Sequence, residues 1–338
     1  MQHPRHLRLA PVVTATVALV TLAACGSDAG SAPAAGGDDA AEGSADQQSG
    51  TVQVTDFQGT VEVPSPAERV VVTDNRVVRA MDAWGVDVVA APLDIFPGDL
   101  SYASDEDVIN LGNHGEPDME GLVAADPDLV LNGYRFESHY ADITELVPDA
   151  VMVDTSTDPE GALEEELARQ ITLVGEALGH QDGAAELVAD LEASIERATE
   201  AYDPEQTVMG LLTSGGDISY VAPVTGRSIG PVFETLDLNP ALEQAADDTS
   251  HGDDISVEAI AEANPDWLLV MDRDAAIAAE GAEFSGAEEL ISESAALQNV
   301  TAVQEGNIVY LPADFYLTED IQAYTAFFDS VADAMGGS

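Results

Sequence analysis

A stretch of sequence that occurs twice sets the frame for the fold of this chain. Residues 120–135 read EGLVAADPDLVLNGYR, and residues 258–273 read EAIAEANPDWLLVMDR. Glu, Pro, Asp and Arg keep the same spacing in both copies, with no gap. Solenoid repeats recur every few tens of residues, whereas this block recurs once, about half a chain away. The repeat therefore predicts two related lobes that arose by duplication.

Each copy of the block has the pattern of a short helix, a turn and a strand. Asp118 and Ser256 are helix N-cap residue types, and an acid follows each of them where a helix N-terminus favours negative charge. A Pro-Asp pair then predicts a turn, and the apolar runs LVLNG and WLLVM predict strands. Each strand ends at an arginine, Arg135 in the first copy and Arg273 in the second.

The rest of the chain supports an α/β fold with two lobes and a helical connection. Residues 51–63 predict a β-hairpin around a Gln-Gly turn, and the strand, helix and strand that follow are typical of a parallel sheet. Residues 160–203 have an almost continuous helical pattern with a break at 179–183, which predicts a long connecting spine. We expect a mainly parallel sheet flanked by helices in each lobe, residues 51–159 and residues 204–338.

Several other elements are delimited by apolar runs and by Gly or Pro. ERVVVTD and VDVVAAP predict buried strands on either side of a helix at residues 75–85. In the second lobe, TVMGLLTS predicts a buried strand and GRSIGPVFETLDL predicts the start of a helix. Residues 320–335 predict a closing amphipathic helix.

The N-terminal residues have the pattern of an export signal and a tether. Residues 1–25 have a basic start, an apolar run too short for a membrane span, and small residues before the only cysteine, Cys25. This ending resembles the bacterial lipobox, in which the cysteine takes a diacylglycerol; the alternative is an ordinary signal peptide with an incidental cysteine. Residues 26–50 are rich in Gly, Ser, Ala and Asp, which predicts a flexible linker. We expect a chain anchored to the outer face of the cytoplasmic membrane through lipid alone.

The charge of the chain excludes one class of partner and makes its arginines informative. Its ten basic residues are all Arg, against 64 acids. Such a surface repels nucleic acid and anionic lipid head groups, so polyanion binding is not expected. An acidic coat of this kind suits salty or alkaline surroundings. In an acidic chain without lysine, the position of each arginine is therefore informative about function.

Three arginines are candidates for an anion site. Ligands of open α/β sheets bind outside the carboxyl ends of the strands, so Arg135 and Arg273 would point into one cleft if the lobes face each other. Arg227 precedes a predicted helix start, where the helix dipole disfavours a positive charge. Three converging guanidinium groups suit a multiply anionic ligand. The alternative for each is a surface ion pair, which contributes at most about 1 kcal/mol.

The other polar residues give weaker signals. Tyr134 and Tyr316 are candidate aromatics of the cleft, although Tyr at strand ends also packs at the edge of a core. His114, His139 and His251 could form a divalent-metal site with the many carboxylates, but no HxH or HxxxH spacing is present. The chain has no P-loop and no cysteine beyond Cys25, so we do not expect an enzyme.

The acids that begin the two blocks, Glu120 and Glu258, have two interpretations. Helix-start electrostatics suffices to explain either one alone. A matched acid on each lobe could also dock a two-fold partner through its basic side chains.

Taken together, these features resemble a known family. The lipobox, the tether, VTDFQGTVEVPSPAERVVV, the two blocks, the spine and the second-lobe layout are similar to the solute-binding lipoproteins of bacterial iron-siderophore and cobalamin ABC importers, class III periplasmic binding proteins. TSGGDISYVAPVTGRSIGPVFETLDL, SHGDDISVEAI and VMDRDAAI are most similar to ferric-catecholate and citrate siderophore binders. The resemblance covers essentially residues 10–335. It implies two α/β lobes bridged by a rigid helix, with a shallow cleft and little hinge closure.

The resemblance also implies roles for individual residues. The residues expected to bind the ligand are Arg135, Arg227, Arg273, His251, Tyr316 and Tyr134. His251 and Tyr316 fall where some members of the family ligate an incompletely coordinated ferric centre directly. Glu120 and Glu258 match the acids that these proteins place against arginines of the permease dimer. After Tyr316 the sequence departs from the glycine-rich turn of many relatives, and we expect Glu319 and Asp320 near the cleft rim.

The sequence therefore predicts a monomeric, lipid-anchored receptor that binds a ferric siderophore and delivers it to an ABC permease. The ferric siderophore is the transported ligand, and no permanently bound cofactor is expected. One alternative is a haem or cobalamin receptor of the same fold, which would need an apolar, aromatic cleft. The other is a zinc- or manganese-binding protein that uses His114, His139 and His251.

Overall fold

The computed structural model describes residues 50–245, 251–277 and 284–337. These residues belong to one compact unit, Gln48–Ser338. The predicted signal and lipidation site, residues 1–25 with Cys25, lie outside the described residues, as does the predicted linker up to residue 49. No helix in the described ranges is both long and apolar enough to cross a membrane.

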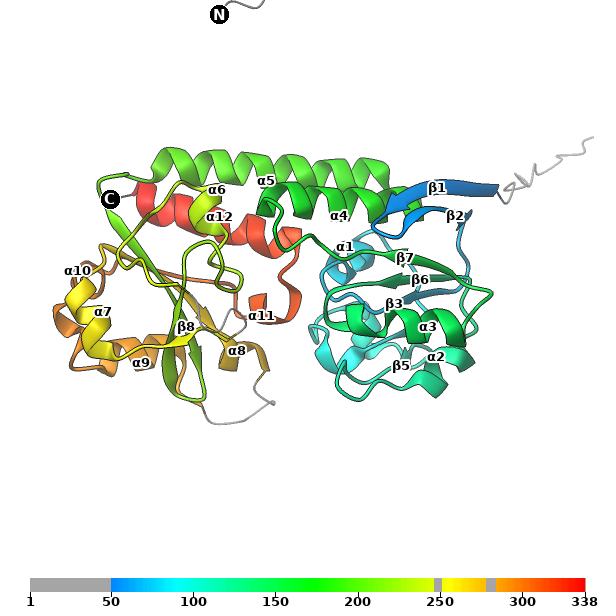
Figure 1. Ribbon diagram of the computed structural model, residues 1–338, viewed down its shortest axis with the longest axis horizontal. Coiled ribbons are helices and arrows are strands. Elements are labelled where there is room, and N and C mark those ends of the chain that lie inside the picture. Colours follow the sequence, from blue (N-terminus) through cyan, green and yellow to red (C-terminus); the bar gives the residue numbers. More distant parts are fainter. Residues whose placement is uncertain (1–49, 246–250, 278–283, 338) are drawn as a thin grey trace, which may run out of the picture. The chain divides into compact units, whose positions relative to one another are not determined.

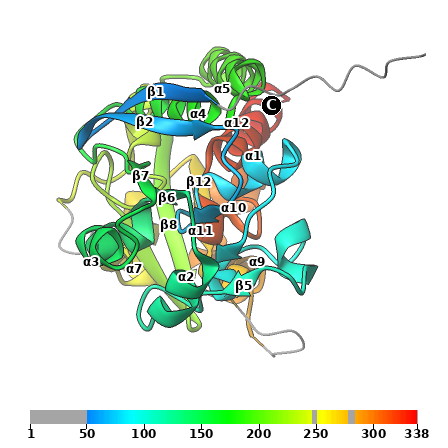
Figure 2. The same cartoon turned by 90° about the vertical axis from the view of Figure 1, so that its right-hand side faces the viewer.

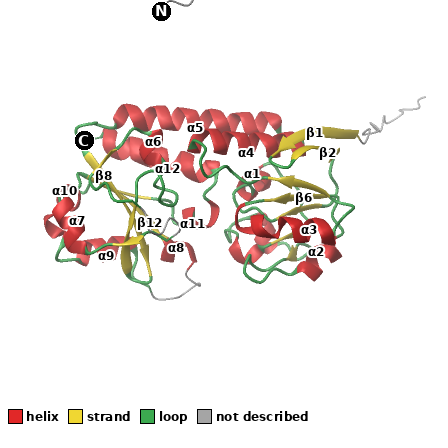
Figure 3. Cartoon of the chain, viewed as in Figure 1, coloured by secondary structure: helices red, strands yellow, loops and turns green. Residues whose placement is uncertain are grey.

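The N-terminal lobe is built on a five-stranded parallel sheet with the order β5-β4-β3-β6-β7. Its strands are β3 (Val70–Val72), β4 (Ala90–Ala91), β5 (Ile109–Asn110), β6 (Leu129–Asn132) and β7 (Val151–Asp154). Its helices are α1 (Val78–Ala83), η1 (Leu93–Ile95), η2 (Ser101–Ser104), α2 (Met119–Ala125), η3 (Tyr134–His139) and α3 (Tyr140–Leu146). Figure 3 shows the helices of this lobe around the sheet.

Helices cover both faces of this sheet, which explains the unbroken apolar runs of its strands. Val70 and Val72 of β3 belong to the core cluster that contains α1, whereas Val71 between them belongs to the cluster with α2 and α3. All three valines are buried. The alternation of side chains along a strand thus sends neighbouring residues into two separate cores.

A separate hairpin of β1 (Gly50–Asp56) and β2 (Gly59–Ser65) precedes this sheet. Asp56 pairs with Gly59, so Phe57 and Gln58 form the turn rather than the predicted Gln-Gly pair. Gly59 has a φ of 136°, which only glycine adopts readily. Val54 and Val63 are the buried residues of the hairpin, and it packs against the spine helix α4.

The C-terminal lobe has a mixed, mainly parallel sheet of six strands. The order is β11-β9-β8-β12-β13, with β10 also paired to β8. Its strands are β8 (Thr207–Ser214), β9 (Asp217–Val221), β10 (Asn239–Pro240), β11 (Asp253–Asp254), β12 (Trp267–Asp272) and β13 (Ile308–Tyr310). Its helices are α6 (Val232–Thr235), α7 (Val257–Ala263), α8 (Arg273–Ile277), α9 (Ala287–Glu293), η4 (Leu297–Asn299), α10 (Thr301–Glu305), α11 (Phe315–Thr318) and α12 (Ile321–Gly336).

The predicted spine consists of two helices, α4 (Leu163–Leu178) and α5 (Gln181–Ala201). The break falls at Gly179, which ends α4 in the left-handed conformation with a φ of 76°. Figure 1 shows α4 and α5 along the same side of both lobes, and Figure 2 shows α5 beside α12, which it contacts. Leu173 and Val174 of α4 belong to the N-terminal core, whereas Leu167 and Ile171 belong to the core around α5 and α12. Helix α4 therefore packs into the cores of both lobes.

The repeated block has the predicted structure in both lobes. Asp118 caps α2 by accepting from Gly121 N at 2.9 Å, and Ser256 caps α7 by accepting from Ala259 N at 3.1 Å. Both helices end at a left-handed residue before the Pro-Asp turn. The strands that follow lie at equivalent places, β6 between β3 and β7 and β12 between β8 and β13.

Two predicted helices are shorter than expected. The helix predicted at residues 75–85 is Val78–Ala83, and the one predicted from residue 226 is the four-residue α6. The loop before α6 is held by close backbone packing instead, because a Cβ on Gly230 would lie 2.2 Å from Gly226 O. Ser228 in that loop has a φ of 60°, which is not helical.

Candidate functional site

A cavity of about 640 Å³ is lined by residues of both lobes. Its lining residues are Asp94, Ile95, Phe96, Gly98, His114, Arg135, Arg227, His251, Arg273, Ala276, Ile277, Tyr316 and Leu317. Arg135 lies in η3, just after β6, and Arg273 is the first residue of α8, just after β12. The carboxyl ends of the two repeat strands therefore supply the two arginines, as expected for an open α/β sheet.

The three predicted arginines surround one aromatic ring, that of Tyr316. The guanidinium carbons of Arg227, Arg273 and Arg135 lie 4.1, 5.2 and 5.3 Å from its centroid. Tyr316 is only 5% exposed, although it lines the cavity. Cation–π attraction at these distances holds the side chains together. It partly offsets the mutual repulsion of three positive charges.

Arg135 and Arg273 keep unused hydrogen-bonding capacity. Arg135 donates from Nη2 to the Tyr316 carbonyl at 2.9 Å, and Arg273 donates from Nη1 to Ser214 Oγ at 3.0 Å. The Nε atom of each is buried and has no hydrogen-bond partner. Across the described residues, no carboxylate forms an ion pair with either guanidinium. Buried cationic donors without an acceptor favour an anion that enters the cavity.

Arg227 is held differently, by a carboxylate beneath the cavity. Its Nε and Nη2 atoms donate to Oε1 and Oε2 of Glu319 at 2.7 and 3.0 Å, and Nη2 also donates to the Tyr134 hydroxyl at 2.8 Å. The two-point contact suits the planar guanidinium. Arg227 therefore lies between the ring of Tyr316 and a buried acid.

Glu319 is the centre of a buried polar cluster, and the prediction that it lies at the cleft rim is wrong. It is 2% exposed and accepts hydrogen bonds from Ser228 and Tyr134 as well as Arg227, while Arg76 lies 3.8 Å away. It ends α11 in the left-handed conformation, with a φ of 44°, which turns its side chain inward. Burial would raise its pKa, but Arg227 and its other partners lower the pKa to about 2.

Tyr134, a predicted ligand residue, lies in this cluster and does not line the cavity. Its φ is 47°, a conformation that costs free energy in a bulky residue and is found at functional sites. The guanidinium carbon of Arg76 lies 3.7 Å from its ring centroid. Burial, together with the charge of Glu319, raises the pKa of Tyr134 to about 12, so it remains a hydroxyl donor.

The same surroundings act in the opposite direction on Tyr316. Burial would raise the pKa of its phenol, but contact with Arg273 and the charges of Arg227 and Arg135 lower it below the usual value. The arginines therefore make the phenolate form of Tyr316 easier to reach than in a free tyrosine. A phenolate oxygen is a good ligand for a hard cation.

The segment that carries Tyr316 is tied to the N-terminal lobe by several side chains. Asn75 donates to the Leu317 carbonyl. Arg79 donates to Asp314 at 2.5 Å and to Asp320 at 3.3 Å. Asp320, also predicted at the rim, is only 1% exposed and caps α12, because its carboxylate accepts from Ala323 N at 2.7 Å. Burial raises its pKa to about 6 against the effect of Arg79.

The predicted histidines are only partly brought together. His114 and His251 line the cavity, whereas His139 bonds through Nε2 to the backbone oxygen of His114 at 2.9 Å. Burial and the nearby Arg135 lower the pKa of His114. In the described part of the chain, no group of three or more His, Cys, Asp or Glu residues could hold a metal ion. This finding does not support the alternative of a three-histidine metal site.

The two matched acids lie on the surface. Glu120 and Glu258 are in the first turns of α2 and α7, and both are exposed. Helix-start electrostatics applies equally to both.

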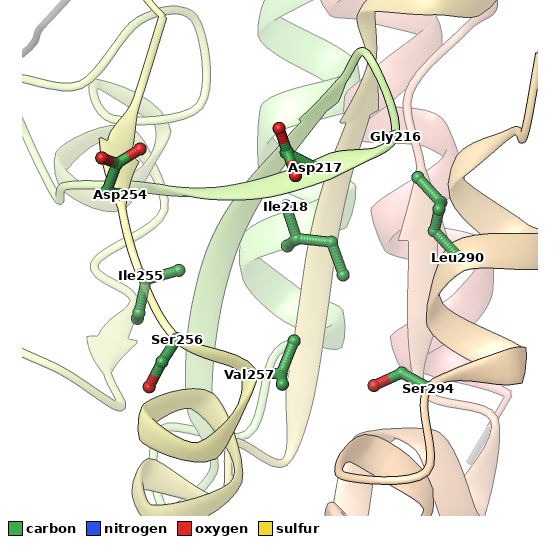
Figure 4. A pocket seen from close by; sticks show the side chains of 9 residues that line it. All are labelled: Gly216, Asp217, Ile218, Asp254, Ile255, Ser256, Val257, Leu290 and Ser294. Carbon is green, nitrogen blue, oxygen red and sulfur yellow. The ribbon is translucent and has the colours of Figure 1, made fainter.

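A second hollow, of about 610 Å³, lies within the C-terminal lobe. Figure 4 shows the residues that line it, which come from the β8–β9 turn and the start of β9, from the stretch between β11 and the start of α7, and from α9 and the residue after it. Asp217 and Asp254 are its charged lining residues. An anion is therefore disfavoured in this hollow and favoured in the arginine-lined cavity.

The sequence analysis missed Arg76, and it placed Glu319 at the cleft rim instead of in the buried cluster. Arg76 follows the carboxyl end of β3, so the reasoning applied to the two repeat strands would have found it. The burial of Glu319 could not be predicted in this way, because an acid in a polar stretch of sequence is expected on the surface.

Comparison with known proteins agrees with the two-lobed fold. The sequence profile of the family described as periplasmic binding protein matches residues 70–315. The petrobactin-binding protein YclQ of Bacillus subtilis is 26% identical over 336 residues, which cover 97% of this chain and 99% of that protein. The YclQ crystal structure has a TM-score of 0.72 at 24% identity, and the match covers 85% of this chain and 99% of that one.

Two further relatives have similar lengths. The ferric-anguibactin-binding protein FatB of Vibrio anguillarum is 27% identical over 262 residues, 77% of this chain and 80% of that protein. A TroA-like periplasmic binding protein from Xylanimonas cellulosilytica is 30% identical in its crystal structure, with a TM-score of 0.68 and coverage of 85% and 98%. The match therefore extends over both lobes.

Proposed function

This chain belongs to the periplasmic binding protein family, and we propose that it is a receptor for an anionic ferric siderophore of the catecholate or citrate type. Members of this family are binding proteins rather than enzymes. The ferric complex is the transported ligand and not a resident cofactor. The names of two relatives, which bind petrobactin and ferric anguibactin, support this class of ligand.

The observation that carries the proposal is the set of three guanidinium groups around Tyr316. Arg135 and Arg273 offer buried donors without partners, and Arg227 is fixed by its carboxylate. The cavity of about 640 Å³ falls in the range of about 300–1,000 Å³ that is usual for small-molecule sites. A ferric complex with anionic oxygens on its surface would satisfy donors that otherwise stay buried and unpaired.

We infer that Tyr316 and His251 reach the ferric ion when the siderophore leaves coordination positions open. Both line the cavity, and the lowered pKa of Tyr316 favours the phenolate that would bind iron. A visible phenolate-to-iron charge-transfer band that is lost in Tyr316→Phe would support direct ligation. An unchanged spectrum in that variant would show that the siderophore alone coordinates the iron.

The proposal is tested by fluorescence titration of purified protein with ferric catecholate, citrate and hydroxamate complexes. We expect saturable quenching by at least one anionic complex and much weaker binding by the Arg135→Ala, Arg273→Ala double variant. Absence of quenching throughout the panel would refute the proposal. The same titrations with haem and cobalamin test the alternative of an apolar ligand. Among the described residues of the lining, only Phe96 and Tyr316 are aromatic apart from the histidines, which speaks against that alternative.

We also propose that the chain is a monomer, anchored through a lipidated Cys25 and the linker that follows it. Lipidation of this residue fits the small residues that precede it. Metabolic labelling with a palmitate analogue, lost in Cys25→Ala, is the expected result. Labelling that persists in that variant would contradict the anchor.

Delivery to an ABC permease is assigned to Glu120 and Glu258. Each lies exposed in the first turn of a repeat helix, so the two acids can meet a two-fold partner with basic side chains. The Glu120→Gln, Glu258→Gln double variant should bind the ferric complex normally and lose cellular iron uptake. Glu262→Gln, an exposed acid later in α7, is the matched control and should retain uptake. Normal uptake by the double variant would show that both acids only stabilise the starts of their helices.

A further inference from the structure

The charges of the ligand site lie in two layers, and the inner layer contains an acid. Arg135, Arg227 and Arg273 line the cavity. Arg76 and Glu319 do not line it and lie behind Arg227 and Tyr134. The four guanidinium groups and the Glu319 carboxylate together leave an excess of three positive charges, apart from Asp94, which also lines the cavity, and the buried Asp74 beside Arg76. Without the carboxylate the excess would be four.

Glu319 is built to stay ionised. It receives hydrogen bonds from Arg227, Ser228 and Tyr134, and it is closed off from solvent. Tyr324 of α12 packs on the same cluster and donates to the Ser228 carbonyl at 3.0 Å. A buried carboxylate with this many donors keeps its negative charge at neutral pH. Its field acts through a water-poor region and is weakly screened.

Resting on the proposed function, we propose that Glu319 is a specificity-determining residue of the ligand site. The negative charge it places behind Arg227 limits the positive potential of the cavity. The site thereby accepts ferric complexes of moderate negative charge and does not strongly prefer the most highly charged ones. Glu319 acts through Arg227 and does not contact the ligand. Its charge therefore changes how much more tightly the site binds a highly charged complex than a less charged one.

The test compares two ferric complexes of different charge. A tris-catecholate complex of ferric iron is trianionic, and a tris-hydroxamate complex is neutral. Dissociation constants for both are measured by fluorescence quenching for the wild type and for Glu319→Gln. We expect the ratio of affinities, trianionic over neutral, to rise about tenfold in the variant, because one buried charge near an ion acts strongly at an effective dielectric constant of about 20. The rise should shrink with added salt.

A substitution of Arg76 changes the charge of the same cluster in the opposite direction. Arg76→Gln removes a positive charge beside Glu319, so the affinity ratio should fall about tenfold. The double variant Arg76→Gln, Glu319→Gln restores the net charge, and its ratio should return close to that of the wild type. This rescue separates an effect of charge from damage to the fold, because a purely structural role would lower both affinities together.

The outcomes are distinct. A ratio unchanged in Glu319→Gln, with or without a general loss of affinity, overturns the inference. If that variant does not fold, an unchanged ratio in Arg76→Gln overturns it equally. A wild type that binds neither these nor any other ferric complex overturns the proposed function itself, and the inference falls with it. Opposite shifts in the two single variants, cancelled in the double variant, support it.

Discussion

Substitution of Arg273 is the most direct test of the cavity. Arg273→Met keeps a long apolar stem beside the Tyr316 ring, whose centroid lies 5.2 Å from the native guanidinium carbon. The substitution removes the charge and the buried Nε donor that has no partner in the unliganded protein. The fold loses the hydrogen bond from Nη1 to Ser214 Oγ at 3.0 Å and the contact of the guanidinium with Tyr316. The main effect should therefore fall on the ligand.

The magnitude follows from the contact that the anion would lose. A hydrogen bond to a charged group contributes about 1.5–3 kcal/mol. Since each 1.4 kcal/mol changes an equilibrium constant tenfold, the dissociation constant for an anionic ferric complex should rise between about tenfold and about 150-fold. Quenching titrations at low and at physiological ionic strength would measure it, and the variant should show the weaker dependence on salt.

Arg197→Met is the matched control. Arg197 is 53% exposed and pairs with Asp329 on the outside of α5 and α12, a surface ion pair that contributes about 1 kcal/mol or less to stability. Its dissociation constant for the ferric complex should equal that of the wild type within about twofold. Equal affinities of Arg273→Met and Arg197→Met would refute the assignment of the anion to the arginine-lined cavity.

Two further predictions concern stability. The pKa of Glu319 is about 2 in the folded protein, against 4.5 for a free side chain. The ionised carboxylate therefore stabilises the folded protein at neutral pH by about 3 kcal/mol. This contribution is lost as the pH falls from about 5 towards 2. Urea unfolding at pH 7 and pH 3 should show a free-energy gap between wild type and Glu319→Gln that narrows at pH 3; a constant gap would contradict this. Asp118→Ala and Ser256→Ala should each lower the free energy of unfolding by about 1 kcal/mol through loss of a helix cap, and a change in only one of the two would show that the repeats are not energetically equivalent.

Much of the fold could be predicted because its signals are local. The apolar runs of β8 and β12 gave buried strands, and the N-cap residues Asp118 and Ser256 gave two helices at matched places. The positions of Arg135 and Arg273 followed from the rule that parallel strands present their carboxyl ends together. Each of these inferences depends on residues that are close in the sequence.

The inner layer of the site could not be predicted, because it depends on contacts between distant residues. Glu319 faces inward through one left-handed residue between two helices, and its partners Arg227, Tyr134 and Arg76 come from three other segments. Tyr134 turns below the cavity through its own positive φ. Neither backbone conformation has a signature in the side chains, since both residues are types that rarely adopt it.

A crystal structure of the protein with a bound ferric siderophore would test the central claim most directly. We predict anionic oxygens of the complex within hydrogen-bonding distance of Arg135, Arg227 and Arg273, with the iron near Tyr316. A ferric complex bound elsewhere, or one whose oxygens leave the Nε atoms of Arg135 and Arg273 unpaired, would contradict the account.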